Sequence, residues 1–186
     1  TEASVADWPR RLERHQAQQT EIVGAVYERY GLTGLWQLAE KAEDSKEVGA
    51  AVARAAWPLE RLAEFVAEAT SGRENRGQVV TGWMEGEPRA RVADVLRLVQ
   101  PRVTAETFQA LLLQAPFVSD IWQLLAMNDA LAKAYWAAVK PQSPFPGEEA
   151  EAVQLLMTAG RPWAAFEAIQ WAPERLDASL LVALLR

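Results

Sequence analysis

Apolar residues recur every three or four positions along most of the chain, with polar residues between them. The first such segment runs from Trp8 to Tyr30, and stretches of roughly 10–14 residues with the same period follow it. Only Val79-Val80 and the run LLVALL near the end resemble strands, and neither alternates between turn signals as a hairpin would. The pattern therefore predicts an all-α chain. One face of the first segment carries Trp8, Leu12, His15, Gln19, Ile22, Val23, Val26, Tyr27 and Tyr30.

Prolines and glycines divide this pattern into separate helices. Proline fits the first turn of a helix and breaks its interior, whereas glycine is favoured just after a helix ends. Gly31 and Gly160 are therefore expected to end helices, and Thr104 and Asp177 to begin them as caps. The proline-rich stretch 140–147 is expected to lack regular structure. Prolines stand between helical segments at Pro58, Pro88, Pro101, Pro116, Pro141, Pro162 and Pro173.

Counting the segments gives about eleven or twelve short helices joined by short loops. Helices of this length are unstable alone in water, so each must bury its apolar face on a neighbour. We therefore predict a right-handed stack of antiparallel helical hairpins, an α-solenoid, forming one domain over residues 1–186. A boundary within it is expected at the loop 140–147. Because the chain begins at Thr1 and stops after an apolar run, we expect it to be a piece of a longer protein.

Composition narrows the functional classes. The chain has 186 residues, half of them hydrophobic, and a formal net charge of -6. The negative charge disfavours a general nucleic-acid or anionic-membrane binder. There is no cysteine, no signal pattern and no apolar run long enough for a membrane helix, which indicates a cytoplasmic protein without membrane contact.

The sequence contains no arrangement of reactive residues typical of an enzyme. The step Gly160-Arg161-Pro162 has one glycine and no preceding strand, so it is interpreted as a boundary between two helices rather than a phosphate-binding loop. His15 is the only histidine, and a zinc site needs three or four ligands. The acidic clusters fit solvated loops and first turns. We therefore expect no catalytic residues, no metal site and no cofactor.

Eight tryptophans are spread at about one per predicted hairpin. Most are expected to fill the space between stacked hairpins, including Trp163 and Trp171. Trp36 lies off the apolar stripe of its helix and is expected to be exposed. Three glycines inside helical segments, Gly24, Gly49 and Gly82, are expected where a neighbouring helix passes close by.

The segment Glu151 to Pro173 resembles a tetratricopeptide-type helical pair. Leu155 and Leu156 precede Gly160 at the turn, and AAFEAIQW supplies the small and aromatic residues of a second helix. The stretches LTGLWQLAEKAEDSKEVGAAVA and AYWAAVKP also resemble degenerate, HEAT-like helical repeats of large bacterial multidomain proteins. This resemblance implies an α-solenoid used for contact or sensing and implies no catalytic residue.

The sequence suggests two functional hypotheses from different classes. The first is a non-enzymatic scaffold or sensor that holds a protein partner or another part of its own chain. The alternative is a nucleic-acid-binding repeat that uses the basic region Arg73–Arg102. A weaker hypothesis is a small-molecule pocket lined by tryptophans. Contact with a partner is predicted for Trp36, Arg73, Arg76, Arg89 and Arg91.

Overall fold

The computed structural model describes residues 7–72, 74–170 and 172–185. Across these residues there are eleven α-helices and no strand, so the all-α prediction is confirmed. The chain divides into two compact units, Thr1–Arg102 (unit 1) and Val103–Arg186 (unit 2). None of the helices in these ranges combines the length and low polarity that crossing a membrane requires.

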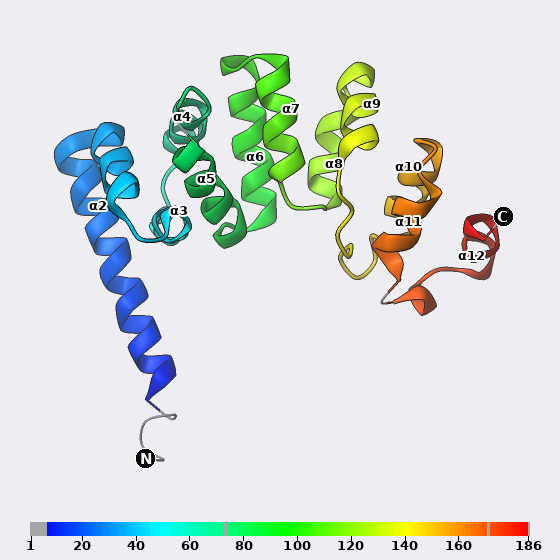
Figure 1. The fold of residues 1–186 in the computed structure, drawn as a ribbon, viewed down its shortest axis with the longest axis horizontal. Coiled ribbons are helices and arrows are strands. Elements are labelled where there is room, and N and C mark those ends of the chain that lie inside the picture. The colour runs from blue at the N-terminus through cyan, green and yellow to red at the C-terminus, as the bar shows by residue number, and fades with distance from the viewer. Residues whose placement is uncertain (1–6, 73, 171, 186) are drawn as a thin grey trace. The chain divides into compact units, whose positions relative to one another are not determined.

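Unit 1 consists of five α-helices and a short 3-10 turn, η1 (Figure 1). Helix α3 packs along α5, and α4 packs along α6, so these two helices lie against the next but one in the chain, whereas α2 packs against α3. Prolines precede two of these helices, as the sequence indicates: Pro58 before α4 and Pro88 before α6. The elements are α2 (Trp8–Lys41), α3 (Ser45–Arg54), α4 (Leu59–Thr70), α5 (Glu74–Gly86), α6 (Arg89–Val99) and η1 (Gln100–Arg102).

Two of the three interior glycines lie at a close helix crossing, as predicted. A methyl group on Gly49 of α3 would lie 1.9 Å from the carbonyl oxygen of Val79, and one on Gly82 of α5 would lie 2.1 Å from that of Lys46. Helices α3 and α5 can approach this closely only because both positions lack a side chain. The prediction is wrong for Gly24, where nothing lies within 4 Å of the added carbon. The side of α2 that carries Gly24 has no neighbour at contact distance among the described residues, although the adjacent Val23 is buried.

Helix α2 turns back on itself at Gly31, where the sequence predicts that its first helix ends. Gly31 has φ 62° and ψ -158°, a conformation that side chains disfavour. Three residues later, a methyl group on Gly34 would lie 2.4 Å from Cβ of Tyr30. The two glycines thus let residues 32–41 fold closely against the end of the preceding helix.

Unit 2 holds six α-helices and the 3-10 turn η2. Helix α7 packs against α9, and α10 packs against α11. The predicted caps are present at Thr104, whose hydroxyl accepts from Thr107 N, and at Asp177, which accepts from Leu180 N. The elements are α7 (Ala105–Gln114), α8 (Ser119–Leu125), α9 (Asp129–Ala138), α10 (Glu149–Thr158), α11 (Pro162–Ile169), η2 (Pro173–Arg175) and α12 (Ala178–Leu184).

The Gly160-Arg161-Pro162 step forms the boundary between α10 and α11, as predicted. Gly160 has a positive φ of 73°, and Pro162 is the first residue of α11. Arg161 has an additional structural contact that the sequence did not suggest. Its Nη1 donates to the carbonyl oxygens of Trp136 at 2.9 Å and Val139 at 2.7 Å, which closes the end of α9.

Tryptophan burial agrees with the prediction at most positions that the structure describes. Trp57, Trp83, Trp122 and Trp136 are buried. The prediction is wrong for Trp163, which is 80% exposed, because α11 turns its small residues Ala164, Ala165 and Ala168 inward instead. Trp171 lies outside the described residues.

Candidate functional site

A groove of about 470 Å³ lies between α2 and α3 in unit 1. Its floor is apolar: Val23, Val48 and Ala51 are buried there, and Ile22 remains 43% exposed. None of the described residues that line it is a tryptophan, so it differs from the tryptophan-lined pocket that the sequence suggests. The groove is lined by Gln19, Ile22, Val23, Leu38, Ala42, Glu43, Asp44, Glu47, Val48 and Ala51.

The rim of the groove is acidic. Glu43, Asp44 and Glu47 are exposed carboxylates, and none of the lining residues is a cation. Lys46, on the same helix as Glu47, pairs with Glu85 of α5 at 2.9 Å. Asp44 caps α3 by accepting a hydrogen bond from Lys46 N at 2.8 Å. An apolar floor beside several carboxylates is suited to a ligand that is partly apolar and positively charged.

Gln19 fixes the two walls of the groove relative to each other. Its Nε2 donates to Oε2 of Glu47 at 3.3 Å, and its Oε1 accepts from Nη2 of Arg54 at 2.8 Å. Nε2 of the same side chain also lies 3.1 Å from Nε2 of His15, one turn earlier on α2. The histidine therefore takes part in an exposed contact on the helix surface.

The turn at Gly31 creates the third wall. Leu38 and Ala42 follow this turn, whereas Gln19, Ile22 and Val23 precede it. The groove thus joins residues far apart along one helical segment with residues of α3. Glu43 and Asp44 belong to the acidic clusters that the sequence pattern indicates to be solvated. Their position between the apolar residues Leu38 and Val48 is the signal that points to the groove.

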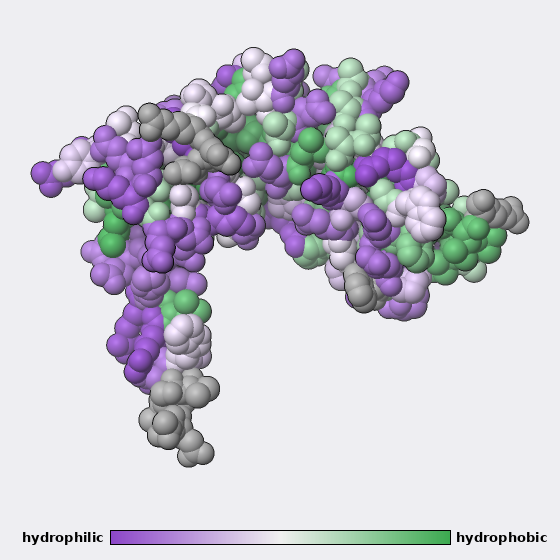
Figure 2. All heavy atoms as spheres, viewed as in Figure 1, coloured by the Kyte–Doolittle hydropathy of each residue, from purple (hydrophilic) through white to green (hydrophobic). Residues whose placement is uncertain are grey.

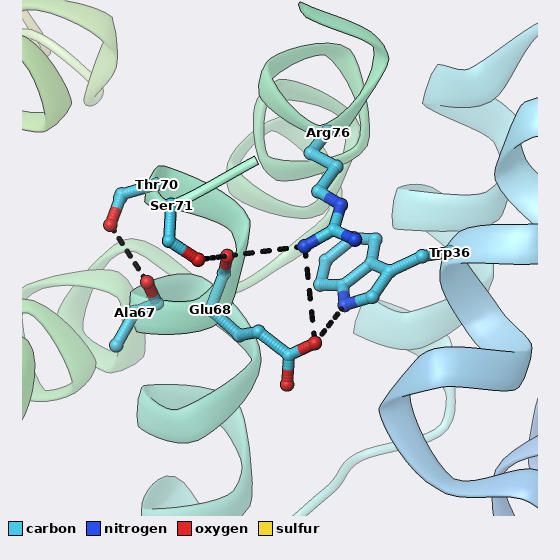
Figure 3. A network of polar contacts seen from close by, with 6 residues as sticks. All are labelled: Trp36, Ala67, Glu68, Thr70, Ser71 and Arg76. Carbon is cyan, nitrogen blue, oxygen red and sulfur yellow. Dashed lines mark hydrogen bonds and ion pairs between the residues drawn. The ribbon is translucent and has the colours of Figure 1, made fainter. Parts of the chain in front are cut away.

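Trp36, predicted to be an exposed contact, is 2% exposed, so the expected exposure is wrong. Its ring stacks on Phe65 of α4, with centroids 5.1 Å apart and planes 11° apart. The indole Nε1 donates to Oε1 of Glu68 at 2.8 Å (Figure 3). Neighbours that come 29 and 32 residues later in the chain bury this tryptophan, and the local apolar stripe gives no sign of them.

Arg76 lies against the same tryptophan. Its guanidinium carbon is 4.9 Å from the Trp36 ring centroid, and its Nη1 is 3.9 Å from Oε1 of Glu68 (Figure 3). Arg76 therefore joins α5 to α4 and α2 by a cation–π contact and an ion pair. Arg73, the preceding arginine in the predicted contact set, lies outside the described residues.

The other predicted arginines also lie in or near internal contacts. Arg91 Nε pairs with Oε1 of the buried Glu87, and its Nη2 donates to the carbonyl oxygen of Trp57 at 2.7 Å. Glu87 in turn accepts from Nε1 of Trp83 at 3.1 Å. Arg89 is half-buried and also has an interaction partner. The arginines of α5 and α6 thus alternate with carboxylates, as ion-paired helix faces do. Their contact with a partner stays a prediction.

Among the described residues of unit 2, three buried polar atoms lack a hydrogen-bond partner of good geometry: Trp122 Nε1, Tyr135 Oη and Glu148 Oε2. Burial raises the pKa of the Tyr135 hydroxyl, and the nearby Trp122 indole lowers it by less. The ring of Tyr135 is completely buried in its unit. Within the described residues, no three potential metal-ligating side chains gather in one place.

We compared the chain with known protein families, with curated proteins and with solved structures. None of the three comparisons finds a match. The function of the groove is therefore inferred from the residues that form it.

Proposed function

We propose that this chain is a non-enzymatic protein-interaction module. Its groove between α2 and α3 would bind an amphipathic, positively charged segment of a partner protein. The observation that carries the proposal is the combination of an apolar floor with a rim of Glu43, Asp44 and Glu47. The packing of α3 on α5 and of α4 on α6 also supports a stack of helical hairpins, the architecture proposed from the sequence.

An amphipathic helix fits the groove better than a flexible polar ligand would. Ile22 is 43% exposed, and the lining residues Leu38 and Ala42 are half-buried, so apolar surface remains accessible in the groove. Helices bind such grooves through apolar side chains spaced three or four residues apart. Arginines or lysines beside those apolar positions would then meet the acidic rim, and this attraction would weaken as salt is added.

The test uses two peptides that differ only in charge. One is an amphipathic 16-residue helix with leucines on one face and arginines beside them, and the other carries glutamates in place of the arginines. We expect the basic peptide to bind in fluorescence anisotropy and the acidic peptide to bind at least about tenfold more weakly. Raising the salt concentration should reduce the difference.

A matched pair of variants locates the binding site. Glu43→Lys with Glu47→Lys reverses the rim, whereas Glu60→Lys with Glu64→Lys makes the same charge change on exposed positions of α4. The rim variant should lose the basic peptide, and the α4 variant should keep it. Equal binding of the two peptides, or loss of binding in both variants, would contradict the proposed function.

A further inference from the structure

The first part of α2, residues 8–18, has no packing neighbour among the described residues. We call this segment the α2 arm (Figure 1). Every residue in it is exposed except Gln16, which is half-buried. Trp8 is 65% exposed and Leu12 is 42% exposed. An isolated helix of this length is marginally stable in water, and its exposed apolar side chains would be stabilised by a partner surface.

The arm has the properties that the groove requires of its ligand. Trp8 and Leu12 are one turn apart and form an apolar stripe, which continues towards Ile22. At 100° per residue, Arg11 flanks this stripe on one side, Arg10 lies nearly opposite it, and Arg14 lies between Arg11 and Arg10. Arg11 lies 3.5 Å from Asp7, in an ion pair that is exposed on both sides. Figure 2 shows a hydrophobic spot within the otherwise hydrophilic surface of the arm.

The arm cannot reach the groove of its own molecule. Gln19, Ile22 and Val23 line the groove, and they continue the same helix without a break until Gly31. A continuous helix holds residues 8–18 on the far side of these positions, so the arm points away from the groove. An occupant with this sequence must therefore come from another molecule.

We propose that the groove of one molecule binds the α2 arm of a second copy of this chain, and that the exchange is reciprocal. This inference rests on the proposed function, because it identifies the basic amphipathic segment as the arm itself. Two antiparallel α2 helices related by a two-fold axis near His15 place Trp8 of each copy opposite Ile22 of the other. These two residues are about 21 Å apart along one helix, at 1.5 Å per residue.

The same pairing brings opposite charges together. Residue 11 of one copy then lies opposite residue 19 of the other, and Gln19 contacts both Glu47 on the groove rim and Arg54 of α3. Arg11 of each copy therefore lies near the acidic rim of its neighbour. Because the same surface is used twice, the two-fold arrangement closes on itself and leaves neither arm uncovered.

Charge reversal tests this arrangement in the full chain by sedimentation velocity. We expect the wild-type chain to dimerise in the micromolar range. The arm variant Arg11→Glu should raise the dissociation constant at least about tenfold, and the rim variant Glu43→Arg/Glu47→Arg at least about 100-fold. A mixture of the two variants should form a heterodimer within about tenfold of the wild-type affinity, because every arm then faces a groove of opposite charge.

Two controls separate this contact from general charge effects. Arg10→Glu reverses a charge on the opposite face of the same arm, and Glu60→Arg/Glu64→Arg reverses two exposed carboxylates on α4. Each should change the dissociation constant by less than about threefold. Circular dichroism should give equal helix content for all variants, because every altered side chain is exposed.

The possible results are distinguishable. A wild-type chain that stays monomeric at about 100 µM overturns the pairing, and so does a dimer that survives both reversals or a mixture that fails to associate. The arm variant then serves as a receptor with its own groove unoccupied. If it binds the basic 16-residue peptide, the proposed function stands without the pairing, and if it binds neither peptide, both fall.

Discussion

At the scale of single residues, the hydroxyl of Tyr135 is buried without forming a hydrogen bond of good geometry. The residue has no exposed surface, and its Oη lacks a hydrogen-bond partner of good geometry. A buried polar group without a partner costs free energy on folding. The ring, in contrast, packs edge-on against Trp136 with centroids 5.1 Å apart. The aromatic ring therefore accounts for the stabilising contribution of this residue.

Tyr135→Phe should leave unit 2 as stable as before or more stable by up to about 1 kcal/mol at neutral pH. Burial raises the pKa of the Tyr135 hydroxyl above its ordinary 10.0. The free energy of unfolding of the wild-type chain is therefore unaffected by ionisation of this group below pH 10 and decreases as the pH rises further. The free energy of unfolding of Tyr135→Phe should decrease less than that of the wild-type chain above pH 10. Urea unfolding at pH 7 and pH 11 checks both expectations.

Tyr30→Phe is the matched control, because the Tyr30 side chain is 58% exposed. It should not reproduce the alkaline difference. A loss of more than about 1 kcal/mol in Tyr135→Phe at pH 7 would show that the hydroxyl has a stabilising partner.

Trp36 shows the limit of sequence reasoning at this scale. Helical periodicity identifies the residues that share a face, and by that criterion Trp36 lies beside the apolar stripe. Its burial depends on Phe65 and Glu68, which a separate helix brings to it. No local pattern predicts contacts between residues about 30 positions apart.

At the scale of helices, the crossing of α3 and α5 depends on two glycines. Gly49→Ala or Gly82→Ala should destabilise unit 1 by at least about 2 kcal/mol, because the added methyl group overlaps a backbone carbonyl. Gly24→Ala makes the same chemical change in α2, where nothing lies within 4 Å. It should stabilise the helix by up to about 1 kcal/mol. Thermal unfolding followed by circular dichroism measures all three, and a similar loss for Gly24→Ala would contradict the packing described here.

The attachment of η2 to α10 depends on Glu149. This carboxylate is 4% exposed, accepts from Gly147 N at 2.6 Å and pairs with Arg175 at 3.1 Å. Burial raises its pKa, but hydrogen bonds from its own backbone, Arg175 and Gly147 outweigh that effect and lower the pKa below 4.5. The stabilisation is therefore present above pH 4.5 and is lost as the pH falls below it.

Glu149→Gln should cost about 1–2 kcal/mol at pH 7 and remove part of the acid sensitivity of unit 2. Urea unfolding between pH 7 and pH 3 measures the slope. The control is Glu151→Gln, an exposed position in the same turn of α10. If both variants retain the wild-type slope, the ion pair with Arg175 does not contribute to the pH dependence.

The sequence predicts the helices well and their partners poorly. Proline and glycine positions, together with caps such as Thr104 and Asp177, locate most helix ends within a few residues. The break at Gly31 is also predicted, because the signal for a positive φ is local. The stripe from Trp8 to Ile22 was identified as a face, yet much of it is exposed. Periodicity shows which side of a helix is apolar and gives no information about whether a neighbour covers it.

At the scale of the whole chain, the described residues form two units, each with its own buried core. The proposed groove lies entirely in unit 1 and needs three segments: the helix before Gly31, the residues after it, and α3. In the sequence, the acidic cluster and the apolar positions are each recognisable separately. Their meeting in one groove depends on the direction in which the chain leaves Gly31, which no local pattern predicts. A single domain over residues 1–186, with a boundary at 140–147, stays a prediction.

The tryptophans give each unit an optical probe of its own. Trp8 and Trp163 are the two solvent-facing indoles among those that the structure describes, one in each unit, at 65% and 80% exposure. Indole emission shifts to shorter wavelength when water is removed from the ring. Covering the arm would therefore shift the Trp8 part of the emission to shorter wavelength, and a Trp8→Phe variant, which lacks this shift, would identify it without an attached dye.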